Sequence, residues 1–558
     1  MTLTTHMATT RVLCFLAVLA TLTAGCSTGE EGTSDRASDT AATGAPSASP
    51  SGRDPSDPSS ASDQAAARAV GTVRPGWGPT RAEIARARSA VSRMSVSQQA
   101  GQVIVARYGG TAPPTALVRR FHLGGVIAMS DNIASVNAVR RSNARLQRSD
   151  ARRWPLLIGT DQEGGIVNRL NAPMTGFPTF MTYGATGNPG LARASAQASG
   201  EELRAAGFTA VFAPDADVTI GSADPTIGSR SAGSRPKVVA RTVTSAVDGY
   251  RSAGIVPVIK HFPGHGSVST DSHVALPVQH ASMRTLRHRD LVPFRAAIAD
   301  HAPVTMIGHL NIRAVDPGTP ATLSRPVITG LLRHRMGFRG LVITDAMEMG
   351  AIVNRYGTAG ATVRSLRAGV DVLLMPADLP TAYHAIVRGV RSGRLPRARL
   401  ADAATRMVAL MMHQQSAGPA PRPRVFGSNK AVSYRASRAA TTVVKGPCKG
   451  RLVGHGVRVS GDGDAVRAFR AAAARAGLST SGGTSVVLLG YGDSARRGDV
   501  VVSTDTPYVL GQSRARSKIA AYGDTPGAMR ALVEVLLGRH RAPGHLPVHV
   551  SGVPRRGC

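Results

Sequence analysis

The chain of 558 residues is poor in acidic residues, aromatic residues and cysteine. Its 34 aspartate and glutamate residues face 67 lysine and arginine residues, which leaves a formal net charge of +33. Such an excess indicates an anionic partner, either nucleic acid or an anionic surface. The basic residues are mostly arginines spread along the chain, without the aromatic-interleaved cluster, zinc knuckle or helix-turn-helix pattern of nucleic-acid-binding proteins. We therefore predict no nucleic-acid partner and favour an anionic cell envelope.

The sequence also has no apolar run near its N-terminus that is long enough to span a membrane, because the run at residues 12–22 is too short. A basic residue precedes this run and small residues follow it, which is typical of a secretory signal peptide. The junction with Cys26 resembles that of bacterial lipoproteins, although Thr23 stands where such signals prefer leucine. We predict a signal peptide at 1–25, a lipidated Cys26 and a lipid anchor on the extracellular face of the cell membrane. An ordinary secretory signal is the alternative.

Four cysteines are too few for a disulfide-rich scaffold. Cys14 would leave with the signal peptide and Cys26 would carry lipid, so Cys448 and Cys558 remain. In an oxidising space outside the membrane we expect these two to form a disulfide. Because the bridge would close a loop of about a hundred residues, the chain-entropy model gives a stabilisation of about 4 kcal/mol.

Composition divides the remaining chain into three parts. Residues 26–75 are rich in Ser, Thr, Asp, Gly and Pro and would form a flexible tether. Residues 80–415 alternate helical stretches with eight short β-rich runs, at residues 102–106, 124–129, 155–160, 210–214, 255–260, 304–309, 340–344 and 371–375. This alternation predicts a TIM-like (β/α)8 barrel, with a doubly wound open sheet as the alternative. Residues 430–558 read as a second, smaller α/β sandwich domain.

Polar side chains follow the ends of the predicted strands, where a barrel of this kind carries its active site. In chain order they are Asp161, Glu163, Asp215, Asp217, His261, His265, His309 and Asp345. Polar residues at the N-terminal ends of the strands would not indicate an active site. We therefore expect the site at this end of the barrel.

The densest cluster is the motif KHFPGHG at 260–266, followed after four residues by Asp271-Ser272-His273. Core packing would leave many of these polar groups unpaired, so we interpret the cluster as functional. A metal site is an alternative, since possible ligands are His261, His265, Asp271 and His273. Lys260 would place a cation beside that metal, and no H-E-x-x-H helix occurs, so we predict neither a metal nor another cofactor.

This cluster closely resembles the marker of bacterial β-N-acetylglucosaminidases of glycoside hydrolase family 3, and the resemblance covers about residues 85–415. It implies that His273 is the acid/base, paired with Asp271. It also implies that Asp345, in the stretch Thr-Asp-Ala-Met at 344–347, is the nucleophile. The residues that would bind the first sugar are Asp161, Arg169, Arg230, Lys260 and His261.

Two positions depart from this resemblance. Ile166 stands where members often carry an arginine after the Gly-Gly pair, and Ala232 stands where they often carry an aromatic residue. Neither is a proposed catalytic group, so the departures concern remote contacts with the substrate. The C-terminal part resembles the end of the second α/β sandwich domain of longer members, for which we expect a role other than supplying the acid/base.

The residues also fit the chemistry without the resemblance. Retaining glycoside hydrolysis needs a carboxylate that attacks the anomeric carbon, which Asp345 can supply, and one proton carrier for both half-reactions. A histidine can donate and accept a proton near neutrality, and a neighbouring carboxylate can orient it. Two residues apart on an extended loop, Asp271 and His273 would project to the same side and meet.

We therefore predict a retaining exo-β-N-acetylglucosaminidase that removes terminal β-linked N-acetylhexosamine from glycosides such as peptidoglycan fragments. Its partners would be N-acetylglucosamine-containing glycosides or cell-wall fragments and, through the lipid, the membrane. One alternative is a glycoside phosphorylase at the same site, because a histidine acid/base does not repel a phosphate dianion. Another is a catalytically silent wall-binding lipoprotein, although the triad of Asp345, His273 and Asp271 argues against it. The Asp-His pair also disfavours β-glucosidase activity.

Overall fold

The computed structural model describes residues 74–554. The predicted signal peptide, Cys26, nearly all of the predicted tether, and Cys558 lie outside the described residues. The described residues belong to one compact unit. Among these residues, no helix is both long and apolar enough to cross a membrane.

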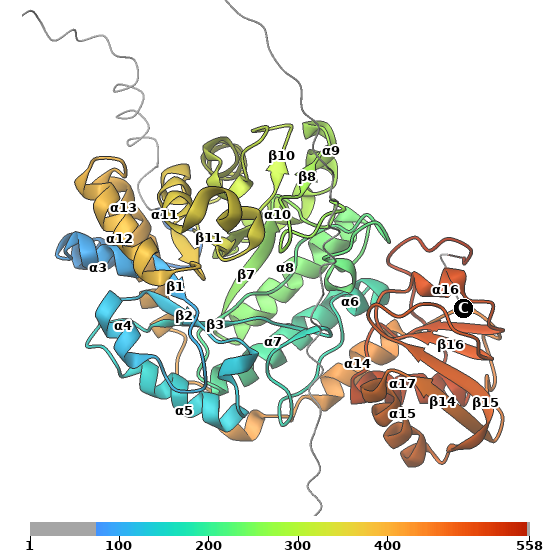
Figure 1. Ribbon diagram of the computed structural model, residues 1–558. Helices are drawn as coiled ribbons and strands as arrows, with labels where there is room; N and C mark the ends of the chain where they lie inside the picture. Colours follow the sequence, from blue (N-terminus) through green and yellow to red (C-terminus); the bar gives the residue numbers. More distant parts are fainter. Residues whose placement is uncertain (1–73, 555–558) are drawn as a thin grey trace, which may run out of the picture. The chain divides into compact units, whose positions relative to one another are not determined.

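Eight parallel strands close into a barrel (Figure 1). In spatial order they are β1 (Ile104–Ala106), β12 (Val372–Leu374), β11 (Leu341–Ala346), β9 (Val304–Ile307), β7 (Val256–Phe262), β6 (Ala210–Val211), β3 (Leu157–Thr160) and β2 (Gly125–Ile127). Each strand overlaps one of the eight predicted runs, in the predicted chain order. The barrel prediction is confirmed, and closure of the sheet shows that the doubly wound alternative is wrong.

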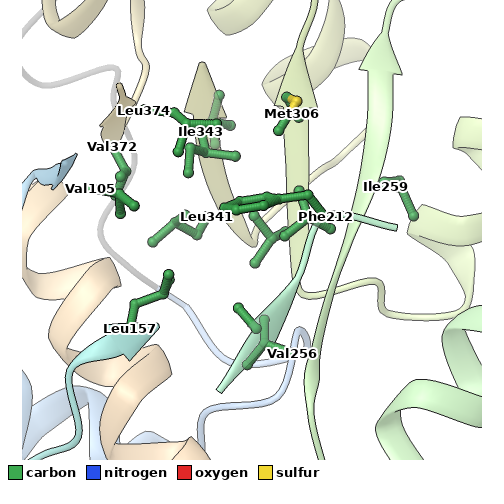
Figure 2. Close-up of a cluster of buried hydrophobic side chains, with 14 of the residues drawn as sticks. Val105, Leu157, Phe212, Val256, Ile259, Met306, Leu341, Ile343, Val372 and Leu374 are labelled. Atoms are coloured by element: carbon green, nitrogen blue, oxygen red, sulfur yellow. The ribbon is translucent and has the colours of Figure 1, made fainter. Parts of the chain in front are cut away.

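Apolar side chains from these strands fill the space between them. Figure 2 shows this cluster, with labels on Val105, Leu157, Phe212, Val256, Ile259, Met306, Leu341, Ile343, Val372 and Leu374. Phe212 is fully buried, and a β-carbon at Gly159 would lie 2.7 Å from its ring. The aromatic side chain therefore requires a glycine on the neighbouring strand, which is how this barrel accommodates a large residue in its packed interior.

Helices connect and cover the strands (Figure 1). They are α2 (Arg81–Ser92), α3 (Val96–Gln102), α4 (Thr115–Phe121), α5 (Val136–Gln147), α6 (Met181–Thr186), α7 (Pro189–Ala205), α8 (Pro236–Ser252), α9 (Met283–His288), α10 (Leu291–Ala299), α11 (Gly350–Ala368), α12 (Leu379–Arg391) and α13 (Arg397–Gln415). Helix α2 begins at a capping box of Thr80 and Glu83 and packs against α13. The first and last described helices of the barrel domain are thereby joined.

Short elements lie in the loops after the barrel strands. Strands β4 (Gln162–Gly164) and β5 (Val167–Asn168) form a hairpin after β3. Strands β8 (Val278–Gln279) and β10 (Asn311–Ile312) pair in parallel, which ties the loops after β7 and β9 together. These pairings restrain the loops at the C-terminal end of the barrel, where the predicted site lies.

The second domain contains a five-stranded sheet (red in Figure 1). Its order is β13 (Thr442–Lys445), β17 (Ser517–Ala520), β16 (Val500–Ser503), β15 (Ser479–Leu489) and β14 (Gly456–Gly461), with β13 antiparallel to β17. Its helices are α14 (Lys430–Ala440), α15 (Gly463–Ala476), α16 (Val509–Gln512) and α17 (Pro526–Leu536). The prediction of a second α/β domain is confirmed.

Two hydrophobic clusters hold the second domain together. One joins the sheet to α15 and α17 through side chains such as Phe469 and Leu532. The other contains Val501 and Tyr522 of the second domain together with Met181 of helix α6. An apolar contact between the barrel domain and the second domain follows from this shared cluster.

Cys448 lies in the loop after β13, and its sulfur forms a disulfide. Cys558, the predicted partner, lies outside the described residues. The pairing of Cys448 with Cys558 therefore stays a prediction.

A buried charge cluster lies at the end of the barrel opposite the predicted site, because Asp371 directly precedes β12. The Asp371 carboxylate accepts hydrogen bonds from Arg333 at 2.5 Å, Arg399 at 2.7 Å and the Val342 N–H at 2.9 Å. Burial alone would raise the pKa of Asp371, but the guanidinium groups of Arg333, Arg399 and Arg406 lower it below its ordinary value. The cluster joins β12, β11 and α13 through charged hydrogen bonds.

We predict that Asp371→Ala lowers the free energy of unfolding by about 3–5 kcal/mol, because it leaves buried guanidinium groups without their counter-ion. Denaturant unfolding followed by circular dichroism measures the loss. Asp248→Ala is the control, because Asp248 makes a solvent-exposed ion pair with Arg251 and its removal should cost less than about 1 kcal/mol. Equal losses in the two variants would contradict a stabilising role for the buried cluster.

Candidate active site

The loops that follow β3, β6, β7 and β11 bring polar residues together at the C-terminal end of the barrel. Because β7, β6 and β3 are adjacent in the barrel, residues after these strands are neighbours in space although far apart in sequence. Strand β7 extends through Phe262, so Lys260 and His261 lie within the strand itself, where both are buried. A rigid strand rather than a loop therefore positions these two side chains.

Glu163 lies between two cations at the centre of this group. Lys260 Nζ lies 2.6 Å from Glu163 Oε1, and Arg230 donates two hydrogen bonds to the carboxylate, at 2.9 and 3.0 Å. The Glu163 side chain is only 3% exposed. Burial alone would raise the pKa of Glu163, but Arg230 and Lys260 outweigh it and hold that pKa well below the ordinary value. Glu163 is thus a permanent anion that orients both cations.

Asp161 extends this network toward solvent. Its Oδ1 accepts a hydrogen bond from Lys260 Nζ at 2.8 Å, and its Oδ2 lies 4.0 Å from an Arg169 nitrogen. The Asp161 and Arg169 side chains are 19% and 25% exposed, so both can reach a ligand. Among the described residues, the buried Arg169 Nε has no hydrogen-bond partner. Arg169 can therefore donate a further hydrogen bond at this edge of the network.

Asp217 organises the histidines of the motif. Its Oδ2 lies 2.8 Å from His261 Nδ1, and its Oδ1 accepts a hydrogen bond from the His265 N–H at 2.5 Å. His261 Nε2 in turn lies 3.4 Å from Arg230. Asp215, which is also buried, has a pKa raised well above its ordinary value by burial and by the nearby charge of Asp217. The site therefore contains one carboxyl group biased toward its neutral form beside one biased toward its anion.

Asp345 lies in the last part of β11. Its Oδ1 accepts a hydrogen bond from the N–H of Ala346 at 2.8 Å. Burial acts to raise the pKa of Asp345, but interactions with His261, His309, the Ala346 N–H and Lys260 outweigh burial and lower the pKa to about 2. Asp345 is therefore a carboxylate at any pH near neutrality, as a nucleophile must be.

Asp271 and His273 are in direct contact on the loop after β7. Asp271 Oδ1 lies 2.7 Å from His273 Nδ1 and also accepts a hydrogen bond from the His273 N–H at 2.9 Å. The backbone bond closes an Asx turn, so the contact forms through a turn rather than through an extended loop. The His273 side chain is 66% exposed, whereas Ser272 is buried with its hydroxyl 2.8 Å from His265 Nε2. Ser272 thus anchors the loop that presents the dyad.

The structure brings most of the predicted site residues together. Those in contact or in electrostatic interaction around Lys260 are Asp161, Arg169, Arg230, His261 and Asp345. The dyad stands apart, and within residues 74–554 no hydrogen bond or ion pair joins His273 to Asp345. Sequence reasoning noted the strand-end residues Glu163, Asp217, His265 and His309 without assigning them a role. Their positions after strand ends were the signal in the sequence. The ion pairs and hydrogen bonds that they form across the barrel explain why polar residues stand there.

His309 supports the loop after β11 from within the barrel. It is fully buried, with Nδ1 2.7 Å from Thr322 Oγ1 and Nε2 3.0 Å from the Ala346 carbonyl. Burial lowers the pKa of His309, so the ring is neutral near pH 7 and can donate one hydrogen bond while accepting the other. This contact fixes the residue that follows Asp345.

One group of side chains has the composition of a cation site. Single ligand atoms of Asp215, Asp217 and His261 lie within 4.8 Å of one another. Arg230 lies 3.7 Å from Asp215 Oδ2, and His261 Nδ1 is already engaged by Asp217. A divalent cation here would lie beside a guanidinium group and displace an existing hydrogen bond. The group is better explained as the internal support of Arg230 and His261.

Ile166 and Ala232, the two residues that depart from the family pattern, lie in different environments. Ile166 lies in the turn between β4 and β5 and is 43% exposed, so it is available to a ligand. Ala232 is fully buried, and a β-carbon added at Gly184 would lie only 1.7 Å from the Ala232 carbonyl oxygen. Ala232 therefore packs against helix α6, and whether either departure changes remote contacts with the substrate stays a prediction.

Comparison with known proteins agrees with this arrangement. Residues 95–410 match the model of the glycosyl hydrolase family 3 N-terminal domain. The chain is 34% identical over 287 residues to β-hexosaminidase A of Pseudoalteromonas piscicida, a match that spans 48% of each protein. It is 33% identical over 312 residues to the β-hexosaminidase LpqI of Mycobacterium tuberculosis, covering 54% of this chain and 79% of the relative.

A solved structure extends the similarity to both domains. The glycoside hydrolase family 3 β-N-acetylglucosaminidase from Paenibacillus sp. str. FPU-7 superposes with a TM-score of 0.75 at 30% identity, covering 82% of this chain and 99% of that one. The family match alone includes more than half of the sequence, with every barrel strand and every residue of the candidate site. The chain therefore belongs to glycosyl hydrolase family 3, a family of glycoside hydrolases, and its relatives there include β-hexosaminidases.

Proposed function

We propose that this chain is a retaining exo-β-N-acetylglucosaminidase, in which Asp345 is the nucleophile and the Asp271–His273 dyad is the acid/base. The observation that carries the proposal is the state of Asp345: a half-buried carboxylate with a pKa of about 2, at the end of a barrel strand and in the field of the Lys260 and His261 side chains. An ionised carboxylate that a substrate can reach is what attack on an anomeric carbon requires.

The network around Lys260 suits a neutral, polyhydroxylated ligand. Lys260 and Arg230 are compensated by Glu163, and Lys260 also by Asp161, so the network does not demand an anionic ligand. Asp161 can accept hydrogen bonds from sugar hydroxyls, while Arg169 and Lys260 can donate to them. His261 and Arg230 complete the proposed subsite for the non-reducing terminal sugar.

Hydrolysis would proceed in two half-reactions. In the first, Asp345 attacks the anomeric carbon and forms an ester to it, while the bond to the leaving oxygen breaks and His273 donates a proton to that oxygen. In the second, His273 takes a proton from a water molecule, the water oxygen attacks the same carbon, and the Asp345 carboxylate is released. Two inversions at one carbon return the β configuration.

The dyad geometry suits His273 to both proton transfers. Because Asp271 engages Nδ1, the opposite ring nitrogen, Nε2, remains available to the glycosidic oxygen or to water. The Asp271 carboxylate would also stabilise the positive ring that forms when His273 takes the proton from water. Since the His273 side chain is 66% exposed, we propose that bound substrate draws this loop toward Asp345.

The substrates we propose are glycosides with a terminal β-linked N-acetylhexosamine, such as peptidoglycan fragments. Support comes from the names of the relatives, which are β-hexosaminidases, and of the Paenibacillus structure, a β-N-acetylglucosaminidase. The net charge of +33 would favour work beside an anionic cell envelope. We further propose that the enzyme is held on the extracellular face of the membrane by lipid on Cys26.

We predict that the two catalytic residues give different defects. Asp345→Ala should abolish turnover of every substrate, whereas His273→Ala should retain glycosylation by 4-nitrophenyl β-N-acetylglucosaminide, because a nitrophenolate needs little protonation to depart. With that substrate the His273 variant should show a burst of nitrophenol and accumulate an adduct on Asp345, which peptide mass spectrometry detects. An adduct on another residue would overturn the assignment.

The same assay contains its own controls for the alternatives. Without added phosphate the wild-type enzyme should release free N-acetylglucosamine, and 4-nitrophenyl β-glucoside should be a much poorer substrate. Formation of a sugar phosphate only when phosphate is present would identify a phosphorylase instead. Absence of turnover by a folded wild-type protein would favour a silent wall-binding protein.

The low pKa of Asp345 predicts the acid limb of kcat/KM. The nucleophile must be ionised, so its contribution is lost only as pH falls toward its pKa of about 2. His261→Gln removes the largest of the positive neighbours, which should raise the pKa of Asp345 toward the ordinary value of about 3.9 and move the acid limb to higher pH. Arg169→Gln is the control and should lower kcat/KM without moving the limb. An unmoved limb in His261→Gln would contradict the electrostatic account.

Processing of the chain can be tested on protein purified from its native membrane. We predict that the mature N-terminus is an acylated Cys26, and that Cys448 is linked to Cys558 in the unreduced protein. Peptide mass spectrometry identifies both. Cleavage elsewhere, or an unmodified Cys26, would rule out the anchor, and two free thiols would rule out the disulfide.

A further inference from the structure

The segment 219–234 carries Arg230 into the proposed sugar site. Asp224 gives the middle of this segment its shape, because its carboxylate accepts hydrogen bonds from the N–H groups of Thr226, Ile227 and Gly228. A single turn of 3-10 helix, η2 (Gly228–Arg230), follows. Side chains on such a turn project about 120° apart, so Ser229 and Arg230 point in different directions.

The two side chains of this turn reach different domains. Arg230 donates two hydrogen bonds to the Glu163 carboxylate in the barrel, at 2.9 and 3.0 Å. Ser229 Oγ donates a hydrogen bond to Asp505 Oδ1, on the loop that follows β16 of the second domain. Ser229 and Asp505 are 1% and 5% exposed. One turn of backbone thus links a sugar-binding arginine to a buried carboxylate of the other domain.

The second domain holds this segment at another point as well. The Ser234 N–H donates a hydrogen bond to the Pro547 carbonyl at 3.1 Å. The second domain itself is fastened to the barrel, since the Tyr522 carbonyl accepts hydrogen bonds from the Thr179 N–H, the Thr179 hydroxyl and the Thr182 hydroxyl. With the shared hydrophobic cluster around Met181, these bonds make the second domain a fixed support rather than a loosely attached one.

The surroundings of Asp505 indicate that its role is to fix the position of a neighbouring side chain. Among the described residues no lysine, arginine or histidine forms an ion pair with it, and the Ser229 hydroxyl is its one side-chain hydrogen-bond donor. A buried carboxylate without a cation is costly, and an apolar residue would pack at such a site at lower cost. The compensating benefit we identify is the fixed position of Ser229, and with it of Arg230.

We propose that Asp505 is a positioning residue for sugar binding: through Ser229, the second domain holds Arg230 on Glu163 and against the first sugar. The contact of Arg230 with sugar rests on the function proposed above, whereas the contact of Asp505 with Ser229 does not. The second domain thereby takes part in the reaction without supplying a catalytic group. The barrel alone would hold Arg230 less firmly.

The test compares Asp505→Ala, Asp505→Asn, Ser229→Ala and the double variant Ser229→Ala/Asp505→Ala with the wild-type full chain on 4-nitrophenyl β-N-acetylglucosaminide. Asp505→Ala and Ser229→Ala should each raise KM about 3- to 10-fold, the worth of one hydrogen bond, with kcat changed much less. The double variant should raise KM no further than the single variants, because both remove one interaction. Asp505→Asn keeps an acceptor oxygen in place and should restore most of the lost affinity.

Asp464→Ala is the matched control, because Asp464 is an exposed acidic residue of the same domain and its side chain is 74% exposed. It should leave KM unchanged. Thermal unfolding of each variant separates positioning from folding: a lower melting temperature with an unchanged KM would overturn the proposal. So would additive effects of Ser229→Ala and Asp505→Ala on KM.

A crystal structure of Ser229→Ala gives a result that does not depend on activity. The proposal expects the Arg230 guanidinium to leave its two-bond contact with Glu163 or to become disordered. If Arg230 still makes both hydrogen bonds to Glu163, as in the wild type, the proposal is overturned whatever the values of KM and kcat. A wild-type enzyme that does not hydrolyse the substrate would instead count against the proposed function, and the crystal structure would still decide the role of Asp505.

Discussion

Two cations share one buried carboxylate at the floor of the proposed sugar site. Lys260 comes from strand β7, Arg230 from the segment 219–234 and Glu163 from the hairpin after β3, so the three contacts join three separate parts of the chain. Glu163 is the anion that both cations share, and it lowers the cost of burying them because an unpaired charge in this environment is far more costly than a paired one. The orientation of Asp161, and the low pKa of Asp345 in part, depend on Lys260 being held there.

Barrel closure supplies the rest of the geometry. A parallel barrel gathers the C-terminal ends of its strands around one opening. This places Asp345, on the seventh barrel strand in chain order, within reach of groups that precede it by more than eighty residues. The proposed acid/base dyad differs in kind, because it is formed within three residues and presented on an exposed loop anchored by Ser272. The proposed roles fit this difference: a nucleophile at the end of a strand must not move, whereas a proton carrier on a loop must approach several leaving groups.

The sequence was sufficient for the strands because a strand buried on both faces is a nearly uninterrupted apolar run, as at 304–309 and 340–344. It also predicted that residues in recognisable motifs, such as Asp161, Lys260 and His261, lie together at the end of the barrel, while their roles stay predictions. It could not assign Glu163 or Asp217, since their importance lies in ion pairs and hydrogen bonds formed across the barrel. The Asx turn that joins Asp271 to His273 replaced the extended loop we expected, because a side-chain acceptor stabilises a turn at that spacing.

A double displacement by Asp345 and His273, as proposed, must release the sugar with the β configuration of the substrate. Proton NMR of the N-acetylglucosamine released in the first minutes, before the anomers equilibrate, measures this configuration directly. We expect the β-anomer to appear first and the α-anomer to form only by mutarotation. Initial release of the α-anomer would mean a single displacement by water and would contradict the assignment of Asp345 as nucleophile.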